Sequence, residues 1–349
     1  VGRVSESVLK RSVLRQIKTH REEVLKGAGV GEDCAFFSWS SSALAVSTQT
    51  ITLPVTMAPS IAVHAAVNNL AAGGIKPVAL TSAITLPIDF EEAGLKSIVS
   101  CLEDVCSQLN IELAGGHTEV SPAVNVPVIS VTALGKPFCR SDNKQKEDSE
   151  QANAWQTAVK VKKEPLTKND KKEFDIVVSK WIGLEGTVIL AKEKQEDLLG
   201  RYPQSMILAA QNLKQYLSVL PEAALAEESG VYMMHDMRNG GIFGALWEIS
   251  QRIGAGLSID LKKIPVKQET IEICEFFELN PYQLLSGGGL IMLTENGKAL
   301  VKRLEDAGIP AVVIGNTNSS NDKIVMNEEE TRYLEPPVPD EIYKVFYHA

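Results

Sequence analysis

The sequence predicts two domains that each combine α-helices with β-strands, in an α/β or α+β arrangement. Its 349 residues are enough for two hydrophobic cores. Strand-like and helix-like apolar patterns alternate in two blocks. Between the blocks, at 140–173, Trp155 is the only aromatic residue among lysines, acids and amides, which is typical of a linker or insertion. We therefore expect domains at 1–138 and 174–349, joined through 139–173.

The first block begins with an amphipathic pattern at 5–26, which predicts a helix. A glycine-rich turn follows it. Apolar runs then predict strands at 34–39, 44–50, 77–86 and 126–134, and helical patterns predict helices at 57–74 and 91–109. Apolar and polar residues alternate in several of these strands, which favours antiparallel or mixed sheets with one covered face over a doubly wound parallel core.

The second block repeats the alternation. Apolar runs predict strands at 174–179, 231–234, 257–264, 289–294, 311–314 and 323–326. Helical patterns predict a short helix after 186 and further helices near 203–220, 240–253, 269–277 and 297–307. This order of elements completes the second domain.

Composition argues against several classes of function. With 35 basic and 44 acidic residues the net charge is −9, which argues against broad nucleic-acid binding. No apolar run approaches the roughly 18 residues of a membrane span, and the N-terminal residues lack an apolar signal core, so we expect a cytoplasmic protein without a membrane partner. The five cysteines are odd in number and form no C-x-x-C, so neither a disulfide framework nor a zinc knuckle is indicated.

Two short polar stretches lie in the first block. Glu32 and Asp33 follow the glycine turn, and paired carboxylates on a loop can hold Mg²⁺, although a solvated turn is the commoner explanation of such a pair. Asn68 and Asn69 lie near the end of an otherwise apolar helix, where buried amides need partners. Packing or helix capping is the simpler explanation for these two residues.

The stretch AGGHTEV, at 114–120, places two glycines before a histidine, a hydroxyl and a carboxylate. Gly115 and Gly116 would let a backbone approach a ligand closely, and Glu119 could reach a cation. His117 is unusual for Mg²⁺, and the H-x-x-x-H and H-E-x-x-H spacings of zinc sites are absent. A metal site, a phosphate cradle and a tight turn between strands all remain open.

A fourth stretch precedes the helix predicted from 240. Backbone N–H groups at a helix start can bind an anion, and Gly240 and Gly241 would allow close approach. Arg238 adds positive charge and Asp236 a carboxylate. Neither a Walker A motif nor a suitable G-x-G-x-x-G is present, so the usual nucleotide loops are absent.

Taken in order, these stretches resemble the superfamily that contains aminoimidazole ribonucleotide (AIR) synthetase (PurM), thiamine-monophosphate kinase, selenophosphate synthetase and the hydrogenase-maturation protein HypE. Its motifs are G-D-D-A-A, T-D, N-D-L-A-x-x-G, G-D-T and D-x-T-x-G-G. The matching stretches are GEDCA (31–35), TQT (48–50), NNLAAGG (68–74), GHT (116–118) and DMRNGG (236–241). IGLEGT (182–187), ALWEI (245–249) and IPV (264–266) are most similar to the HypE-like branch. The resemblance covers about 5–335.

The resemblance implies a homodimer in which N-terminal strands of two subunits form a β-barrel, with an α+β domain following. It also implies ATP in a cleft near the dimer interface, Mg²⁺ held by the acidic motifs, and transfer of phosphate to, or activation of, an unknown small substrate. Position by position, it implies nucleotide contacts at Asp33, Asn69, Gly115, Gly116, His117, Thr118, Asp236, Gly240 and Gly241. The implied metal ligands are Glu32, Asp33 and Glu119. No catalytic residue is assigned.

The chain departs from the family pattern where metal binding depends on it. Gln49, Asn69 and His117 stand at positions of family acids, which removes Coulomb attraction for a divalent ion. Glu119 could restore one charge, and Arg238 stands where the family has threonine. No cysteine follows Cys274, so the C-terminal cysteine chemistry of HypE is not expected in cis.

Three functions follow from these observations. The first is an ATP-dependent enzyme with an altered metal site, acting in hydrogenase or metallocofactor maturation. The second is a catalytically degenerate relative that binds a nucleotide or anion and works in assembly or regulation. The third, outside the family, is a transition-metal enzyme that uses His64, His117, Glu119 and His235.

Overall fold

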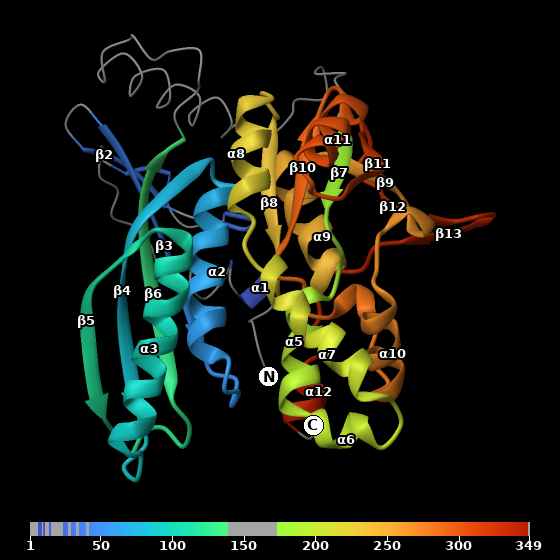
Figure 1. Ribbon diagram of the computed structural model, residues 1–349. Coiled ribbons are helices and arrows are strands. Elements are labelled where there is room, and N and C mark those ends of the chain that lie inside the picture. Colours follow the sequence, from blue (N-terminus) through green and yellow to red (C-terminus); the bar gives the residue numbers. More distant parts are fainter. Residues whose placement is uncertain are drawn as a thin grey trace.

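The computed structural model of the chain describes residues 6–8, 10, 14, 24–26, 29–32, 35–39, 42–138 and 173–347. They form a two-domain α/β fold with a mixed sheet in each half, which confirms the predicted fold class (Figure 1). Of the predicted linker at 139–173 only Glu173 is described, so the domain limits stay a prediction. None of the helices in the described residues has the length and apolar character that a membrane span requires.

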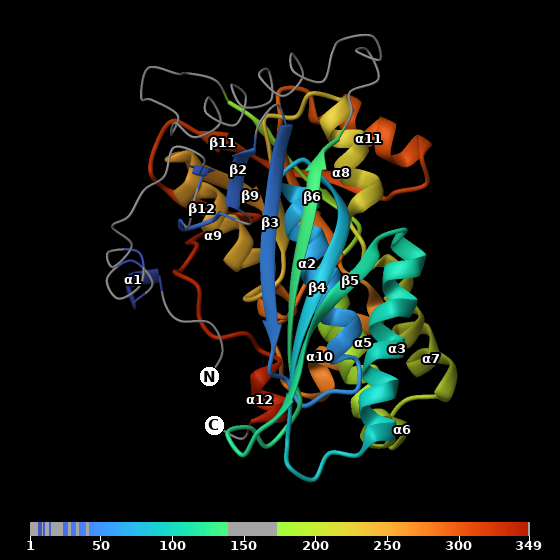
Figure 2. The same ribbon diagram turned by 90° about the vertical axis from the view of Figure 1, so that its left-hand side faces the viewer.

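The N-terminal sheet has the strand order β1-β2-β3-β6-β4-β5. Its strands are β1 (Val24–Lys26), β2 (Ala35–Trp39), β3 (Ser42–Ile51), β4 (Ile75–Leu86), β5 (Glu112–Val120) and β6 (Val128–Pro137). The described pairs are antiparallel except β4 with β5, which leaves β5 as a parallel edge strand. Helix α2 (Ala58–Ala72) packs on β3 and β6, and α3 (Glu92–Leu109) packs on α2 and β5. Figure 2 looks onto the opposite face, where no described helix covers these strands.

Helix α2 is buried on almost every side. Thirteen of its fifteen residues are buried, and its sequence is apolar all round, as a helix between two layers requires. It lies between the N-terminal sheet and the C-terminal half in Figure 1. One hydrophobic core accordingly runs from the N-terminal strands through α2 into helices of the C-terminal half. The two domains thus share a core.

The C-terminal sheet has the order β13-β12-β9-β11-β7-β10-β8. Its strands are β7 (Asp175–Ser179), β8 (Met233–Met237), β9 (Gly256–Asp260), β10 (Gly289–Thr294), β11 (Ala311–Asn318), β12 (Lys323–Asn327) and β13 (Glu330–Tyr333). Helix α9 (Gly241–Ile253) covers one face, whereas α8 (Leu220–Glu228) and α11 (Gly297–Asp306) cover the other. Strand β10, which lies between β7 and the edge strand β8, is therefore buried throughout.

The remaining helices gather below this sheet in Figure 1. They are α5 (Leu184–Glu193), α6 (Gln195–Leu199), α7 (Gln204–Asn212), α10 (Gln268–Phe276) and the short C-terminal α12 (Tyr343–Phe346). Apolar residues of α5, α7 and α10 join the core that contains α2. The C-terminal half therefore meets the N-terminal half through helices as well as through its sheet.

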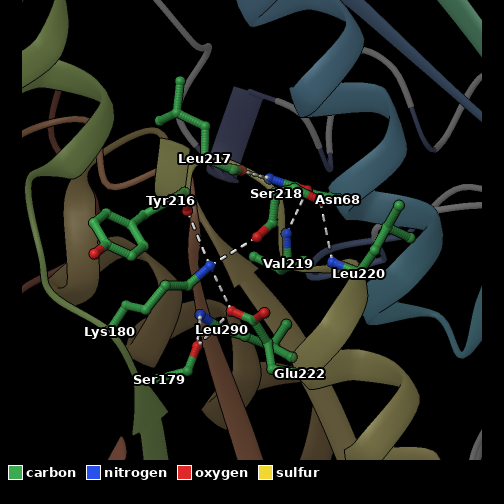
Figure 3. A network of polar contacts seen from close by, with 10 residues as sticks. All are labelled: Asn68, Ser179, Lys180, Tyr216, Leu217, Ser218, Val219, Leu220, Glu222 and Leu290. Atoms are coloured by element: carbon green, nitrogen blue, oxygen red, sulfur yellow. Dashed lines mark hydrogen bonds and ion pairs between the residues drawn. The ribbon is translucent and has the colours of Figure 1, made fainter. Parts of the chain in front are cut away.

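Asn68 of α2 ties the two halves together (Figure 3). Its side-chain amide donates to the Leu217 carbonyl at 2.8 Å, and its carbonyl oxygen accepts from the Val219 backbone N–H at 3.0 Å. Both contacts are buried, so the asparagine satisfies two backbone groups that would otherwise be costly to bury. The packing explanation for Asn68 is thereby confirmed.

A buried ion pair supports the same segment from below. Lys180 Nζ donates to the carbonyls of Tyr216 (2.9 Å) and Ser218 (2.7 Å) and lies 2.7 Å from Glu222 Oε1 (Figure 3). Ser179 Oγ also donates to Glu222, at 3.0 Å. Burial lowers the pKa of Lys180, although the charge of Glu222 opposes that shift. The three ammonium hydrogens are all used.

Two expectations for the first domain are corrected. The predicted helix at 5–26 does not extend to residue 26, because Val24–Lys26 is strand β1 and pairs with β2. At the other end of this stretch, residues 6–8 form helix α1. Pairing that buries Leu25 outweighs the helical pattern there. Most of the stretch between lies outside the described residues.

The second correction concerns AGGHTEV, which is not a turn. All seven residues belong to β5, with an irregularity in the register around Ala114. A Cβ on Gly116 would lie 1.9 Å from the Ser82 carbonyl oxygen, so glycine is required there for β4 and β5 to pair. The glycines therefore have a structural reason within the sheet.

Helix boundaries in the second domain also differ from the predictions. The helix predicted near 203–220 ends at Asn212 and continues as a 3₁₀ turn (Leu213–Tyr216), and α8 begins separately at Leu220. Strand β8 extends through His235 and Asp236 to Met237. Asp236 is consequently held on a buried strand.

Candidate functional site

A pocket of about 470 Å³ lies between the two domains. Its walls come from β3 and the residues after it, from α2, from β8 and the turn that follows, from α9, and from α12. The lining residues are Glu32, Thr48, Gln49, Thr50, Ile51, Thr52, Leu53, Asn69, Asp236, Arg238, Asn239, Ala245, Glu248 and Tyr343. Stretches that are far apart in the sequence therefore meet in one place.

Two amide side chains lie in the N-terminal wall of the pocket. Gln49 lies on β3 and Asn69 on the neighbouring helix α2, where the Asn69 side chain donates to Ser47 Oγ at 3.1 Å. Adjacent residues of α2 thus have different surroundings, since Asn68 contacts the C-terminal half and Asn69 lines the pocket. Gln49 and Asn69, the two amides that face the pocket, carry no charge.

Arg238 lies in the C-terminal wall of the pocket. Its Nε and Nη2 donate to the two carboxylate oxygens of Glu185, at 3.3 and 3.1 Å, in the bidentate geometry that suits a guanidinium. Burial would lower the pKa of Arg238, but the charges of Glu185 and Asp236 and the bonds to Glu185 raise it above its ordinary value. Arg238 is therefore a permanent positive charge in the pocket.

The C-terminal segment closes this side of the pocket. Asp340 is buried and accepts backbone N–H bonds from Gly240 (2.7 Å), Ile342 (3.0 Å) and Leu285 (3.1 Å). Burial raises the pKa of Asp340 to about 7, although these three bonds counteract the rise. The Gly240 N–H at the start of α9 therefore already donates to a side chain of the same chain, that of Asp340.

Other residues of the same segment reach the pocket and the first domain. Tyr343 lines the pocket, and burial raises the pKa of its hydroxyl. Tyr347 donates through its hydroxyl to the Thr52 carbonyl at 2.9 Å, next to the pocket wall. The segment therefore contacts both halves of the chain.

The described residues do not fit a protein-bound divalent ion. Glu32 Oε2 lies 2.5 Å from Lys26 Nζ and 3.5 Å from Arg252 Nη2, so its charge is already paired. Glu248 Oε2 lies 3.1 Å from His235 Nε2. No group of three or more His, Cys, Asp or Glu side chains is placed for a metal among the described residues, and Asp33 lies outside them.

The predicted ligands of AGGHTEV are not in the pocket. His117 and Glu119 lie on the edge strand β5 with 73% and 54% of their side chains exposed, 3.7 Å apart. Gly115, Gly116 and Thr118 belong to the same strand and do not line the pocket either. Within a single chain, this motif therefore lies outside the pocket, which is lined by residues of the other four family stretches.

The histidines of the third hypothesis are spread over three elements. His64 lies in α2, His117 in β5 and His235 in β8. Burial, with a smaller contribution from Lys180, lowers the pKa of His64 to about 4. With no metal-binding group formed in the described part of the chain, the structure offers this hypothesis no centre.

Sequence reasoning did not identify several residues around the pocket. They are Lys26, Glu185, Arg252, Asp340 and Tyr343. Glu185, Arg252 and Asp340 contact partners more than fifty residues away, whereas Lys26 pairs with Glu32 six residues later. Of these residues, Glu185 belongs to a stretch that resembles the family, IGLEGT. The others lacked any local pattern.

Comparison with protein families decides the relationship. The model for the AIR synthase related protein, N-terminal domain, matches residues 31–136, and that for the C-terminal domain matches 175–327. The chain belongs to the AIR synthase related protein family. This membership agrees with the resemblance that the motif stretches of the sequence indicate.

Individual relatives support the HypE-like branch. This AIR synthase related protein is 24% identical, over 82% of its length and 78% of the relative, to a protein of Methanocaldococcus jannaschii named for hydrogenase expression and formation. It is 24% identical to the carbamoyl dehydratase HypE of Rhodobacter capsulatus, over 73% and 68% of the two chains. A crystal structure of the hydrogenase maturation protein HypE in complex with ATP has the same fold, with a TM-score of 0.66, 17% identity and coverage of 98% and 97%.

Proposed function

We propose that the chain binds ATP in the pocket between its two domains and uses it to phosphorylate or activate a small substrate, in a HypE-like role in hydrogenase or metallocofactor maturation. The observation that carries this proposal is that the pocket gathers Gln49, Asn69, Asp236 and Arg238, all from family motif stretches, out of both halves. A volume of about 470 Å³ suits a small-molecule ligand. A relative with the same fold has been solved with ATP.

The two walls of the pocket would perform different tasks. The amides of Gln49 and Asn69 can donate and accept hydrogen bonds, which suits the polar, uncharged parts of a nucleotide. Arg238 supplies charge on the opposite wall, which suits phosphate oxygens. ATP supplies the phosphoryl group, and these residues would hold and orient it, which is the main protein contribution in phosphoryl transfer.

Titration calorimetry tests the proposal. ATP is titrated into the full chain with Mg²⁺ and again with EDTA, and ADP serves as the second probe. We expect saturable binding of one nucleotide per pocket. Absence of binding by both nucleotides at millimolar concentration would refute the proposal.

A non-catalytic role in assembly or regulation is the second candidate. It is favoured by the amides at positions 49 and 69 and by the ion pairs that already occupy Glu32. Both features weaken divalent-metal binding, on which phosphoryl transfer commonly depends. ADP release under saturating ATP separates the candidates: turnover supports the enzyme, and binding without turnover supports the assembly role.

We also propose that β5 mediates formation of a homodimer. Among the described residues β5 pairs only with β4, so it is an edge strand with unpaired backbone groups on its outer side, and every residue of it except Leu113 is exposed. Nearby, the open face of the sheet carries cross-strand hydroxyl pairs, Thr48 with Thr132 and Thr50 with Ser130. A second subunit there would cover both surfaces and could bring His117 towards a neighbouring pocket.

Sedimentation tests this arrangement. Val120 lies on β5 with 59% exposure, and Val120→Glu would introduce a charge into the contact. We expect a wild-type dimer and a monomeric variant, whereas Val99→Glu on α3 serves as a matched control that stays dimeric. A monomeric wild type at micromolar concentration would exclude the arrangement.

A further inference from the structure

We propose that Arg238 binds the anionic end of the pocket's ligand in place of a divalent cation, with Glu185 as its positioning residue. This deepens the proposed function, on which it rests, by assigning the source of positive charge. The ligand class is a phosphate-bearing molecule that binds without a bridging metal ion.

Arg238 has donors left for a ligand. A guanidinium has five N–H groups, and Glu185 accepts from two of them. Within the described residues the other three form no hydrogen bond, and the side chain lines the pocket. A planar cation with three available donors can bind two phosphate oxygens at once.

Glu185 holds the guanidinium in that orientation. Its side chain is 5% exposed and that of Arg238 is 11% exposed, so the pair sits in the pocket wall with little freedom. A Cβ at Gly287 would lie 1.9 Å from Glu185 Oε2, so only glycine leaves room for the carboxylate. The bidentate contact thus fixes one edge of the guanidinium and leaves its other edge for the ligand.

The charges around the pocket make a bridging cation unnecessary. Glu32, which lines the pocket, lies 2.5 Å from Lys26 Nζ and 3.5 Å from Arg252 Nη2, so its negative charge is already paired. The Nε of Arg252 is buried and has no hydrogen-bond partner among the described residues. Relative to the family pattern, Gln49 and Asn69 each remove a negative charge and Arg238 adds a positive one. These three changes raise the charge by three relative to the family pattern, which is more than the two positive charges of one Mg²⁺.

Calorimetry with two probes tests the inference on the full chain. ATP and inorganic pyrophosphate are each titrated in EDTA and in excess Mg²⁺. We expect wild-type affinities in the two buffers to agree within about threefold, and Arg238→Gln to weaken binding in EDTA by about tenfold or more, since a charge-assisted contact is lost. Arg238→Lys should stay weak, because an ammonium is not a planar fork. Arg201→Gln, an exposed arginine paired with Glu275, is the matched control.

A second variant separates binding from folding. Arg238→Gln leaves the buried Glu185 without its cation, so Arg238→Gln/Glu185→Gln is measured beside it, with the folded fraction checked by circular dichroism. We expect the double variant to fold and to bind as weakly as the single one. Glu185→Gln alone should change the ratio of the EDTA and Mg²⁺ affinities, which a loss of folded protein would not do.

The outcomes distinguish the two proposals. ATP binding that strictly requires Mg²⁺, or that the double variant retains at wild-type strength, overturns the role of Arg238 and leaves the proposed function intact. Arginine-dependent binding of pyrophosphate without ATP binding supports the role of Arg238 and refutes the proposed function. If neither probe binds in either buffer, both proposals fall.

Discussion

Two buried pairs of opposite charge, Lys180 with Glu222 and Arg238 with Glu185, lie in the same half of the molecule but differ in what remains unused. Lys180 gives its hydrogens to Glu222 and to two backbone carbonyls, so the ammonium is saturated. Arg238 gives two of five N–H groups to Glu185 and faces the pocket with the rest. Burial of a charged pair therefore does not by itself indicate a binding site.

The difference lies in the chemistry of the two cations and in their surroundings. An ammonium surrounded by three acceptors stabilises a turn, here the segment that packs against Asn68. A guanidinium held along one edge still presents a second edge to a ligand. Counting donors against partners separates the structural pair from the candidate functional one.

The largest effect should come from breaking the saturated pair. Lys180→Met leaves Glu222, which is 1% exposed, without its cation, and we expect a loss of about 3–5 kcal/mol in the free energy of unfolding. Urea unfolding measures this loss. ATP affinity, measured in urea-free buffer and corrected for the folded fraction, should not change.

The exposed pair of Lys302 with Asp306 on α11 provides the control, because Lys302→Met should cost well under about 1 kcal/mol. If Lys180→Met were as stable as the wild type, or if it lost ATP affinity while folded, the distinction between the two pairs would be wrong.

Asp340 extends the comparison to a carboxylate held by backbone N–H groups. Its pKa of about 7 in the folded chain lies above the ordinary value of 3.8, so its contribution is fully present below about pH 4 and is lost as the pH rises through 7. In Asp340→Asn this titration is absent. Between pH 4 and pH 8 the wild type should therefore lose on the order of 4 kcal/mol more unfolding free energy than the variant does.

Chemical unfolding of both proteins at several pH values tests this prediction, because other titrating groups cancel in the difference. A difference that stays constant across this range would show that Asp340 does not titrate there.

The smallest effect should distinguish the two neighbouring asparagines. Asn68→Ala leaves the Leu217 carbonyl and the Val219 N–H unsatisfied, and we expect a loss of about 2 kcal/mol in unfolding free energy. Asn69→Ala loses its bond to Ser47 and should cost about 1 kcal/mol or less, but should weaken ATP binding. Urea unfolding and calorimetry on both variants measure the contrast; equal changes in both quantities would contradict it.

Most of the fold could be predicted because its signals are local. Helix α3, strand β10 and the apolar helix α2 carry periodic patterns long enough to identify without tertiary information. Val24–Lys26 could not be assigned, because three residues next to a helical pattern become a strand only when β2 pairs with them. For AGGHTEV the sequence left a turn open as one of three interpretations, because its glycines, required by the close approach of β4, look locally like turn residues.

The fold class, the family and the positions where the pocket lacks acids can all be read from residue type and order along the chain. Which of two adjacent asparagines faces the pocket, that Glu32 is already paired, and that Glu185 holds Arg238 emerge only when the chain is folded. Folding brings Arg238 to Glu185 and Arg252 to Glu32 across more than fifty residues of chain, and whether a charged group is saturated or available depends on all the groups around it.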